Sequence, residues 1–281
     1  MAYDAARARV VMFGGSGGSI ATAYLDETWL WDGATWIEAA PAVRPPGRIW
    51  SAMSYDAAAQ RVVLFGGVDD AGPRGDTWLW DGASWLGYAG AAPPARYSPT
   101  LAYDAARAET ILFGGSDGNV ATPAYTETWA WTGIAWVERA PAVQPPPRDR
   151  HVLAPRGGDG VVVFGGVGAD GFLRDDTWTW DGTSWALATA APTPVARSEA
   201  SFVDVTSRGR TILFGGRATG PMLRDDTWSW DGNGWEEGAP VTSPPARYQA
   251  AMAYDAARDA VVLFGGTDGV LRDDTWLLTA E

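Results

Sequence analysis

One pattern recurs six times along the 281 residues: a short apolar run ends in Phe-Gly-Gly, a variable loop follows, and then comes Thr-Trp. The segment 61–85 holds a complete copy, in which Thr-Trp extends to Thr-Trp-x-Trp-Asp-Gly and one more Trp follows. The Gly pairs begin at Gly14, Gly66, Gly114, Gly165, Gly215 and Gly265. The Thr-Trp pairs contain Trp29, Trp78, Trp129, Trp178, Trp228 and Trp276. Six copies about 50 residues apart indicate stacked repeats, so we expect a single domain.

Each copy has the pattern of four short strands. The second, such as 61–65, is apolar on both faces, as a strand covered by a sheet on each side must be. The third is Thr-Trp-x-Trp, which places both Trp side chains on one face. Asp-Gly then favours a tight turn into a fourth strand that begins near the next Trp. Helical periodicity is absent from the sequence, which predicts an all-β protein.

Four-stranded units at this spacing suit a β-propeller, whose blades bury their faces against one another. The chain resembles the kelch family, as found in bacterial kelch proteins and the central domain of galactose oxidase. The resemblance rests on Gly66-Gly67, on the spacing of Trp78 and Trp85, and on the Pro-x-Arg that ends at Arg96. It implies a six-bladed propeller of four-stranded antiparallel blades. The predicted blades are 1–43, 44–92, 93–143, 144–192, 193–243 and 244–281.

The two ends of the sequence predict an unusual closure of the ring. The chain starts within a first strand at 1–4 and stops after a third strand around Trp276, so we expect three strands in the sixth blade. We expect the termini side by side in adjacent blades, with closure by packing between the first and sixth blades. The last strand would then be an open edge, where another copy or another chain could pair.

Composition excludes several functions. The net charge is −13 and every basic residue is Arg, so nucleic acid and anionic membranes are poor partners. Apolar runs are too short for a membrane helix, and we expect a soluble protein, either cytoplasmic or secreted. The resemblance to galactose oxidase would imply a Tyr–Cys crosslink and two His copper ligands, but the chain has no Cys and only His151. We therefore expect no metal and no cofactor.

The candidate ligand site lies where the repeat changes its chemistry. Of the 17 Trp residues, only Trp50 falls outside the repeat framework. It follows Arg48 by two residues, and its counterparts in the other blades are Ser98, Arg150, Glu199 and Gln249. In the kelch arrangement the first strand is innermost, so these residues would surround one mouth of the central channel. The predicted ligand-binding residues are Trp50, Tyr97, Arg150, His151, Glu199, Tyr248 and Gln249.

Two functions remain open from the sequence. The first, which we favour, is a non-catalytic scaffold that binds a protein, peptide or glycan at the channel mouth and the adjoining loops. The second is a hydrolase or lyase that uses Glu199, Arg150 and His151, if these converge with perturbed pKa values. Rim residues can also vary simply because nothing packs on them. The long loops that hold Tyr24 and Tyr125 are the alternative location for binding.

The other recurring residues are expected to be structural. The 16 framework Trp residues fit a core between blades. The arginines that precede each first strand should pair with backbone carbonyls or nearby acids, and we call them the framework arginines: Arg48, Arg96, Arg148, Arg197 and Arg247.

Overall fold

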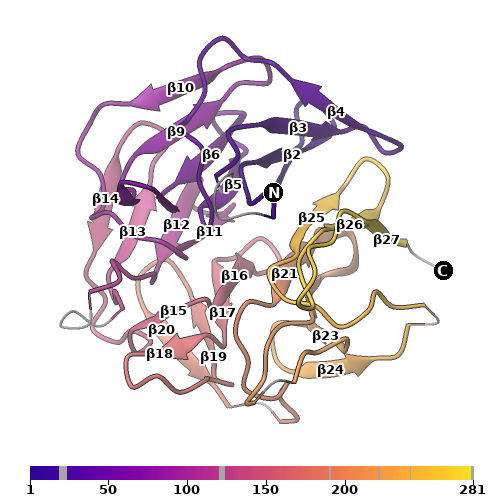
Figure 1. Cartoon of the computed structure of the whole chain (residues 1–281). Coiled ribbons are helices and arrows are strands. Elements are labelled where there is room, and N and C mark those ends of the chain that lie inside the picture. Colours follow the sequence, from indigo (N-terminus) through magenta and orange to yellow (C-terminus); the bar gives the residue numbers. More distant parts are fainter. Residues whose placement is uncertain (19–23, 120–123, 190, 221, 241, 280–281) are drawn as a thin grey trace.

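The computed structural model describes residues 1–18, 24–119, 124–189, 191–220, 222–240 and 242–279. Six antiparallel sheets stand in a ring, which makes the protein an all-β, six-bladed β-propeller (Figure 1). The first strand of each blade lies next to the central axis and the last lies at the periphery. Within the described residues the helical content is a single 3₁₀ turn, Thr206–Arg208, and no helix is long and apolar enough to span a membrane.

The strands follow the repeat. Blade 1 contains β1 (Ala2–Asp4), β2 (Arg9–Phe13), β3 (Thr28–Trp31) and β4 (Trp36–Ala39). Blade 2 contains β5 (Ala52–Asp56), β6 (Arg61–Phe65), β9 (Thr77–Trp80) and β10 (Trp85–Tyr88). Blade 3 contains β11 (Thr100–Asp104), β12 (Glu109–Phe113), β13 (Thr128–Trp131) and β14 (Trp136–Arg139). Blade 4 contains β16 (Val152–Pro155), β17 (Val161–Phe164), β19 (Thr177–Trp180) and β20 (Trp185–Ala188).

Blade 5 contains β21 (Ser201–Val205), β22 (Arg210–Phe214), β23 (Thr227–Trp230) and β24 (Trp235–Gly238). Blade 6 contains β25 (Ala251–Asp255), β26 (Ala260–Phe264) and β27 (Thr275–Thr279). Four two-residue strands form small ladders outside the blades: β7 (Val68–Asp69), β8 (Gly72–Pro73), β15 (Arg148–Asp149) and β18 (Val167–Gly168).

The Trp that begins each fourth strand joins its blade to the preceding one. Trp85 is 1% exposed; its Nε1 donates a hydrogen bond to Thr28 Oγ1 at 2.9 Å, and its ring meets Phe13 edge-on at a centroid distance of 5.3 Å. The same ring also lies against Trp80 of its own blade. The other four such Trp residues donate to the Thr of the preceding blade in the same way: Trp36 to Thr275, Trp136 to Thr77, Trp185 to Thr128 and Trp235 to Thr177. These contacts place the core between the blades, where each aromatic pair adds about 0.5–1.5 kcal/mol beyond its area burial.

The framework arginines fix the segment that enters each blade to the Gly pair and the third strand of that same blade. Arg148 is fully buried and forms a bidentate pair with Asp176 at 2.6 and 2.8 Å, while it also donates to the carbonyl oxygens of Gly165 and Pro146. Three other blades repeat the bidentate pair: Arg48 with Asp76, Arg197 with Asp226, and Arg247 with Asp274. This confirms the expected pairing with carbonyls and nearby acids.

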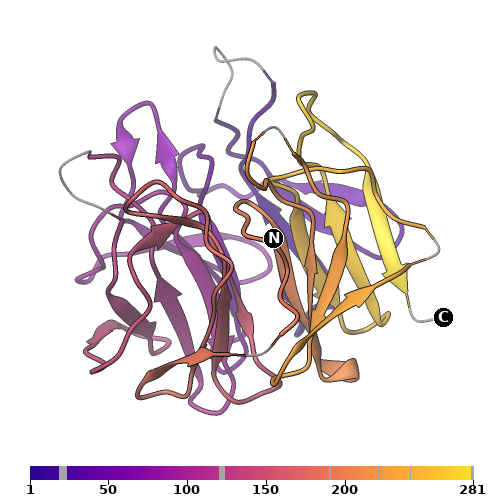
Figure 2. The same cartoon turned by 90° about the horizontal axis from the view of Figure 1, so that it is seen from below.

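The ring closes by packing of blade 1 against blade 6. Trp36 of blade 1 donates to Thr275 at 3.0 Å and meets Phe264 at a centroid distance of 5.4 Å. Blade 6 has three strands in the described part of the chain, and β1 pairs with β2 of its own blade. The terminal blades are therefore neighbours, as expected. The two ends themselves lie apart, because β1 is next to the axis and β27 is at the periphery (Figures 1 and 2).

Candidate ligand site at the channel mouth

The five positions that differ between blades share one backbone conformation. Each lies just before the first strand of its blade, after a residue that bridges to the segment behind the Gly-Gly pair. All five have positive φ without being Gly: Trp50 (55°), Ser98 (49°), Arg150 (52°), Glu199 (57°) and Gln249 (59°). Left-handed backbone is unfavourable for residues with a Cβ. The surrounding structure must therefore compensate for backbone strain at all five positions.

Backbone hydrogen bonds connect neighbouring members of this ring. The amide of Ser98 donates to the carbonyl of Trp50, that of Glu199 to Arg150, and that of Gln249 to Glu199, each at 2.9 Å. Each of these amides therefore points toward the preceding blade. The five positions are brought together around the inner ends of the first strands, where we place the channel mouth.

Aromatic rings occupy the side of the mouth formed by blades 2 and 3. The Trp50 and Tyr97 rings lie 5.7 Å apart between centroids, tilted by 45°. Trp50 is 42% exposed, whereas the Trp residues that begin the fourth strands of blades 2 and 4 are 1–2% exposed. An accessible pair of rings is a surface on which a planar or apolar group can stack.

Charged and amide groups occupy the side formed by blades 4 to 6. Gln249 Nε2 donates to Glu199 Oε1 at 2.6 Å, and the Glu199 carboxylate lies 3.8 Å from the Arg217 guanidinium. Arg217 in turn lies over the ring of Tyr248, 4.8 Å from its centroid. These side chains form one connected group with donors and acceptors near solvent.

Asp149 and Arg150 lie beside this group. Arg150 Nε is 3.9 Å from Asp149 Oδ1, which is a loose contact. Burial raises the pKa of Asp149, the Arg150 charge lowers it, and the Glu199 charge raises it, with an upward shift as the result. Asp149 Oδ1 is buried without a hydrogen-bond partner, which is unusual for a carboxylate oxygen in a folded protein.

His151 lies apart from the rest of the predicted residues. It is 4% exposed, its Nε2 lies 2.6 Å from Thr100 Oγ1, and its ring meets Phe113 at a centroid distance of 5.4 Å. Burial, together with the Arg148 charge, lowers the pKa of His151 to about 3, so the imidazole is neutral near pH 7. The side chain belongs to the packing between blades 3 and 4 and does not reach the mouth.

Arg217 is a residue of the mouth that the sequence interpretation missed. It follows the Gly pair of blade 5 and bridges to Ser198, the residue before Glu199. Its counterparts after the other Gly pairs are Ser16, Val68, Ser116, Val167 and Thr267. Three of these counterparts are small hydroxyl residues and two are Val, so Arg217 is the single charged residue at this position of the repeat, and that departure could have identified it from the sequence.

The long loops of blades 1 and 3, the alternative location for binding, are described only in part. Residues 19–23 and 120–123 lie outside the described residues. Tyr125 is described, and its ring lies 3.8 Å from the guanidinium carbon of Arg96, the framework arginine whose acidic neighbour, Glu127, is 3.7 Å away. Tyr125 therefore supports the framework of blade 3.

Two well-formed cavities lie away from the mouth. One, of ≈ 220 Å³, opens between blades 5 and 6; the other, of ≈ 300 Å³, lies near Asp204 and Asp231, at the opposite end of the strands. Comparison with known proteins adds no function: no protein-family model matches the chain, and no curated protein is significantly similar to it.

Proposed function

We propose that the protein is a non-catalytic binding scaffold that holds a peptide, protein or glycan at the channel mouth. We also infer a propeller of the kelch type, from the Phe-Gly-Gly and Pro-x-Arg elements in their six-bladed setting. Many propellers present ligands on one end of the ring, where variable residues stand on a rigid framework.

The observation that carries the proposal is the set of non-Gly residues at five left-handed positions. The chain uses Gly freely at other positive-φ sites, including all six Gly pairs. At the mouth it has instead Trp50, Arg150 and Glu199, side chains that offer stacking, charge and hydrogen bonding. In the described part of the chain, four other non-Gly residues have positive φ, and all four stand in turns between first and second strands: Ala8, Gln60, Ala108 and Asp259. The five at the mouth are distinguished by their clustering and, at Trp50, Arg150 and Glu199, by large or charged side chains, and clustered backbone strain is a feature of functional sites.

The chemistry of the mouth favours an amphipathic ligand. The aromatic pair suits the face of a sugar ring or a Pro or aromatic side chain. Arg150 and Arg217 suit a carboxylate, and Glu199 and Gln249 suit hydroxyl or amide hydrogens. A ligand with an apolar face and a polar end would span both halves.

The hydrolase or lyase alternative receives less support. It required Glu199, Arg150 and His151 to converge, and His151 points instead at Thr100 and Phe113 between two blades. With its pKa lowered to about 3, it is also a poor general base for chemistry near neutral pH.

The test is a peptide and glycan array, followed by calorimetry with the best ligand. Trp50→Ala and Arg217→Ala should each weaken binding, and a stacked Trp that acts as a hot spot should cost at least about 2 kcal/mol of binding free energy. Asp231→Ala, at the opposite end of blade 5, is the matched control and should bind normally. Loss of binding in Asp231→Ala alone, with both mouth variants unaffected, would place the site at the opposite end.

A further inference from the structure

The interface between blades 5 and 6 lacks a side chain that the other five interfaces have. In each of those, the Trp of a fourth strand donates to a Thr of the preceding blade and contacts a Phe of its second strand. The corresponding Thr and Phe of blade 5 are Thr227 and Phe214, which pair with each other across β23 and β22. No such Trp reaches them from the described part of blade 6, which ends with β27.

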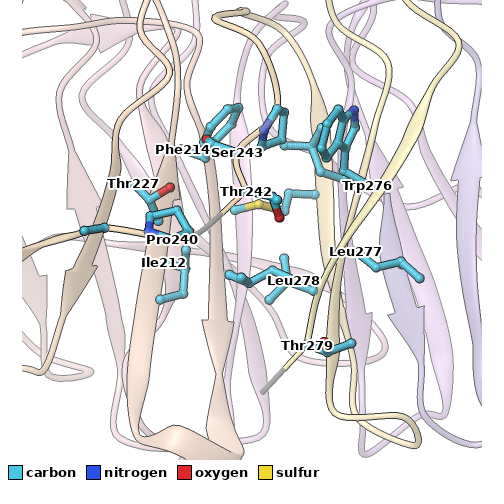
Figure 3. A pocket seen from close by; sticks show the side chains of 15 residues that line it. Ile212, Phe214, Thr227, Pro240, Thr242, Ser243, Trp276, Leu277, Leu278 and Thr279 are labelled. Carbon is cyan, nitrogen blue, oxygen red and sulfur yellow. The ribbon is translucent and has the colours of Figure 1, made fainter. Parts of the chain in front are cut away.

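A cavity occupies the place of that missing Trp. Its volume is ≈ 220 Å³, and its lining includes Phe214, Thr227, Met252, Leu263 and Leu278. Figure 3 shows Thr227 and Phe214 on the blade 5 side of the opening and Leu278 pointing into it from β27, while Leu277 points away. An apolar cavity of about 150 Å³ accommodates an aromatic ring, so this one has room for an indole.

The backbone around the cavity matches the setting of the filled interfaces. In blades 2 and 4 the Trp amide donates to Val43 and Val143, residues that stand five positions before a framework arginine. Thr242 stands five positions before Arg247 and lines the cavity. One edge of β27 pairs with β26, and the other has no partner strand among the described residues. The site therefore combines a Trp-sized cavity with an open strand edge.

We propose that this edge accepts, in trans, an extended segment of a partner protein that carries a Trp. The segment adds as the fourth strand of blade 6, antiparallel to β27, with its Trp opposite Leu278, as Trp235 stands opposite Trp230 in blade 5. The incoming indole Nε1 donates to Thr227 Oγ1, and its ring packs against Phe214. The site is separate from the channel mouth and does not depend on the function proposed there.

A second copy of this chain is the less suitable occupant. Its five fourth-strand Trp residues are already bonded within their own ring. Trp50 stands in a left-handed turn rather than a strand, and Trp276 Nε1 donates to Asp274 of its own blade. The occupant must therefore bring a Trp of its own.

The test uses a labelled eight-residue peptide with the sequence of 182–189, GTSWALAT, and fluorescence anisotropy with the full chain. We expect saturable binding that is lost when the peptide Trp is changed to Ala. Changing it to Phe removes the indole N–H and should weaken binding about fivefold, as expected for one hydrogen bond. With Thr227→Val as the protein, the preference for the Trp peptide over the Phe peptide should be about fivefold smaller, because the acceptor is gone and only the difference in ring size remains.

A variant with its own fourth strand is the matched control. The sequence of 181–189 placed directly after Leu278 supplies the turn and the Trp in cis. This variant should melt at a higher temperature and should no longer bind the peptide. Absence of peptide binding to the unmodified chain, or binding that persists in this variant, would overturn the proposal. A dimer that the peptide cannot dissociate in sedimentation experiments would also overturn it and assign the edge to a second copy.

Discussion

Arg148 and Arg150 are two residues apart and have opposite surroundings. The Arg148 side chain is 0% exposed and is paired with Asp176 through two hydrogen bonds; that of Arg150 is 37% exposed and has one loose contact, at 3.9 Å. Arg148 is copied in every blade from the second to the sixth, whereas the Arg150 position holds a different residue type in each. Recurrence thus marks the residues that build the ring, and variation marks the residues free to serve a ligand.

The largest effect should separate these two arginines. Arg148→Met leaves the partly buried Asp176 without its cation and the carbonyl oxygens of Gly165 and Pro146 without their donor, and should cost about 3 kcal/mol of unfolding free energy. Arg150→Met removes no such pair and should stay within about 0.5 kcal/mol of the parent. Urea denaturation of both variants measures the difference. Equal losses would contradict the division into framework and mouth.

His151 extends the comparison, because it follows Arg150 directly and yet lies in the packing between blades. Its pKa is lowered to about 3, mainly by burial, while an unfolded His titrates near about 6.5. Below about pH 6.5 the unfolded chain binds a proton that the folded chain does not. Stability is therefore complete above that pH and falls as the pH decreases toward 3.

This predicts a loss of about 2 kcal/mol between pH 7 and pH 5 that depends on His151. It is measured by urea unfolding at the two pH values. His151→Phe should lack this loss, and as the chain contains a single His, the difference between parent and variant isolates it. A His151 exposed at the mouth would instead give parallel pH profiles in the two proteins.

The sequence predicts the ring far better than the mouth. Six Gly pairs and six Thr-Trp pairs predict the number of blades because each copy must bury its faces against the next. The sequence does not predict the face of the blade toward which the His151 side chain points. In a strand, side chains alternate between the two faces, and the left-handed Arg150 interrupts that alternation. The grouping of Arg217 with Glu199 depends on a bridge between distant segments. The missing Trp of blade 6 is visible in the sequence, but whether its space stays open depends on packing.

The smallest effect tests the strained backbone on which the proposed function rests. At a left-handed position, Gly avoids a strain of about 1–2 kcal/mol that Ala has to bear. Gly also lowers the free energy of unfolding by about 0.5–1 kcal/mol relative to Ala, because it has more conformational freedom in the unfolded chain. Ser98→Gly should therefore have a free energy of unfolding about 0.5–1 kcal/mol higher than that of Ser98→Ala. The free energy of unfolding of Trp50→Gly should be higher than that of Trp50→Ala by a similar amount. Ala108, with φ 54° in a turn at the far end of the strands, provides the control, since Ala108→Gly should gain stability without affecting the ligand. Trp50→Gly should lose the ligand as Trp50→Ala does. Gly and Ala variants of equal stability would show that the backbone is unstrained, and the retention of Trp50, Arg150 and Glu199 would then need no functional reason.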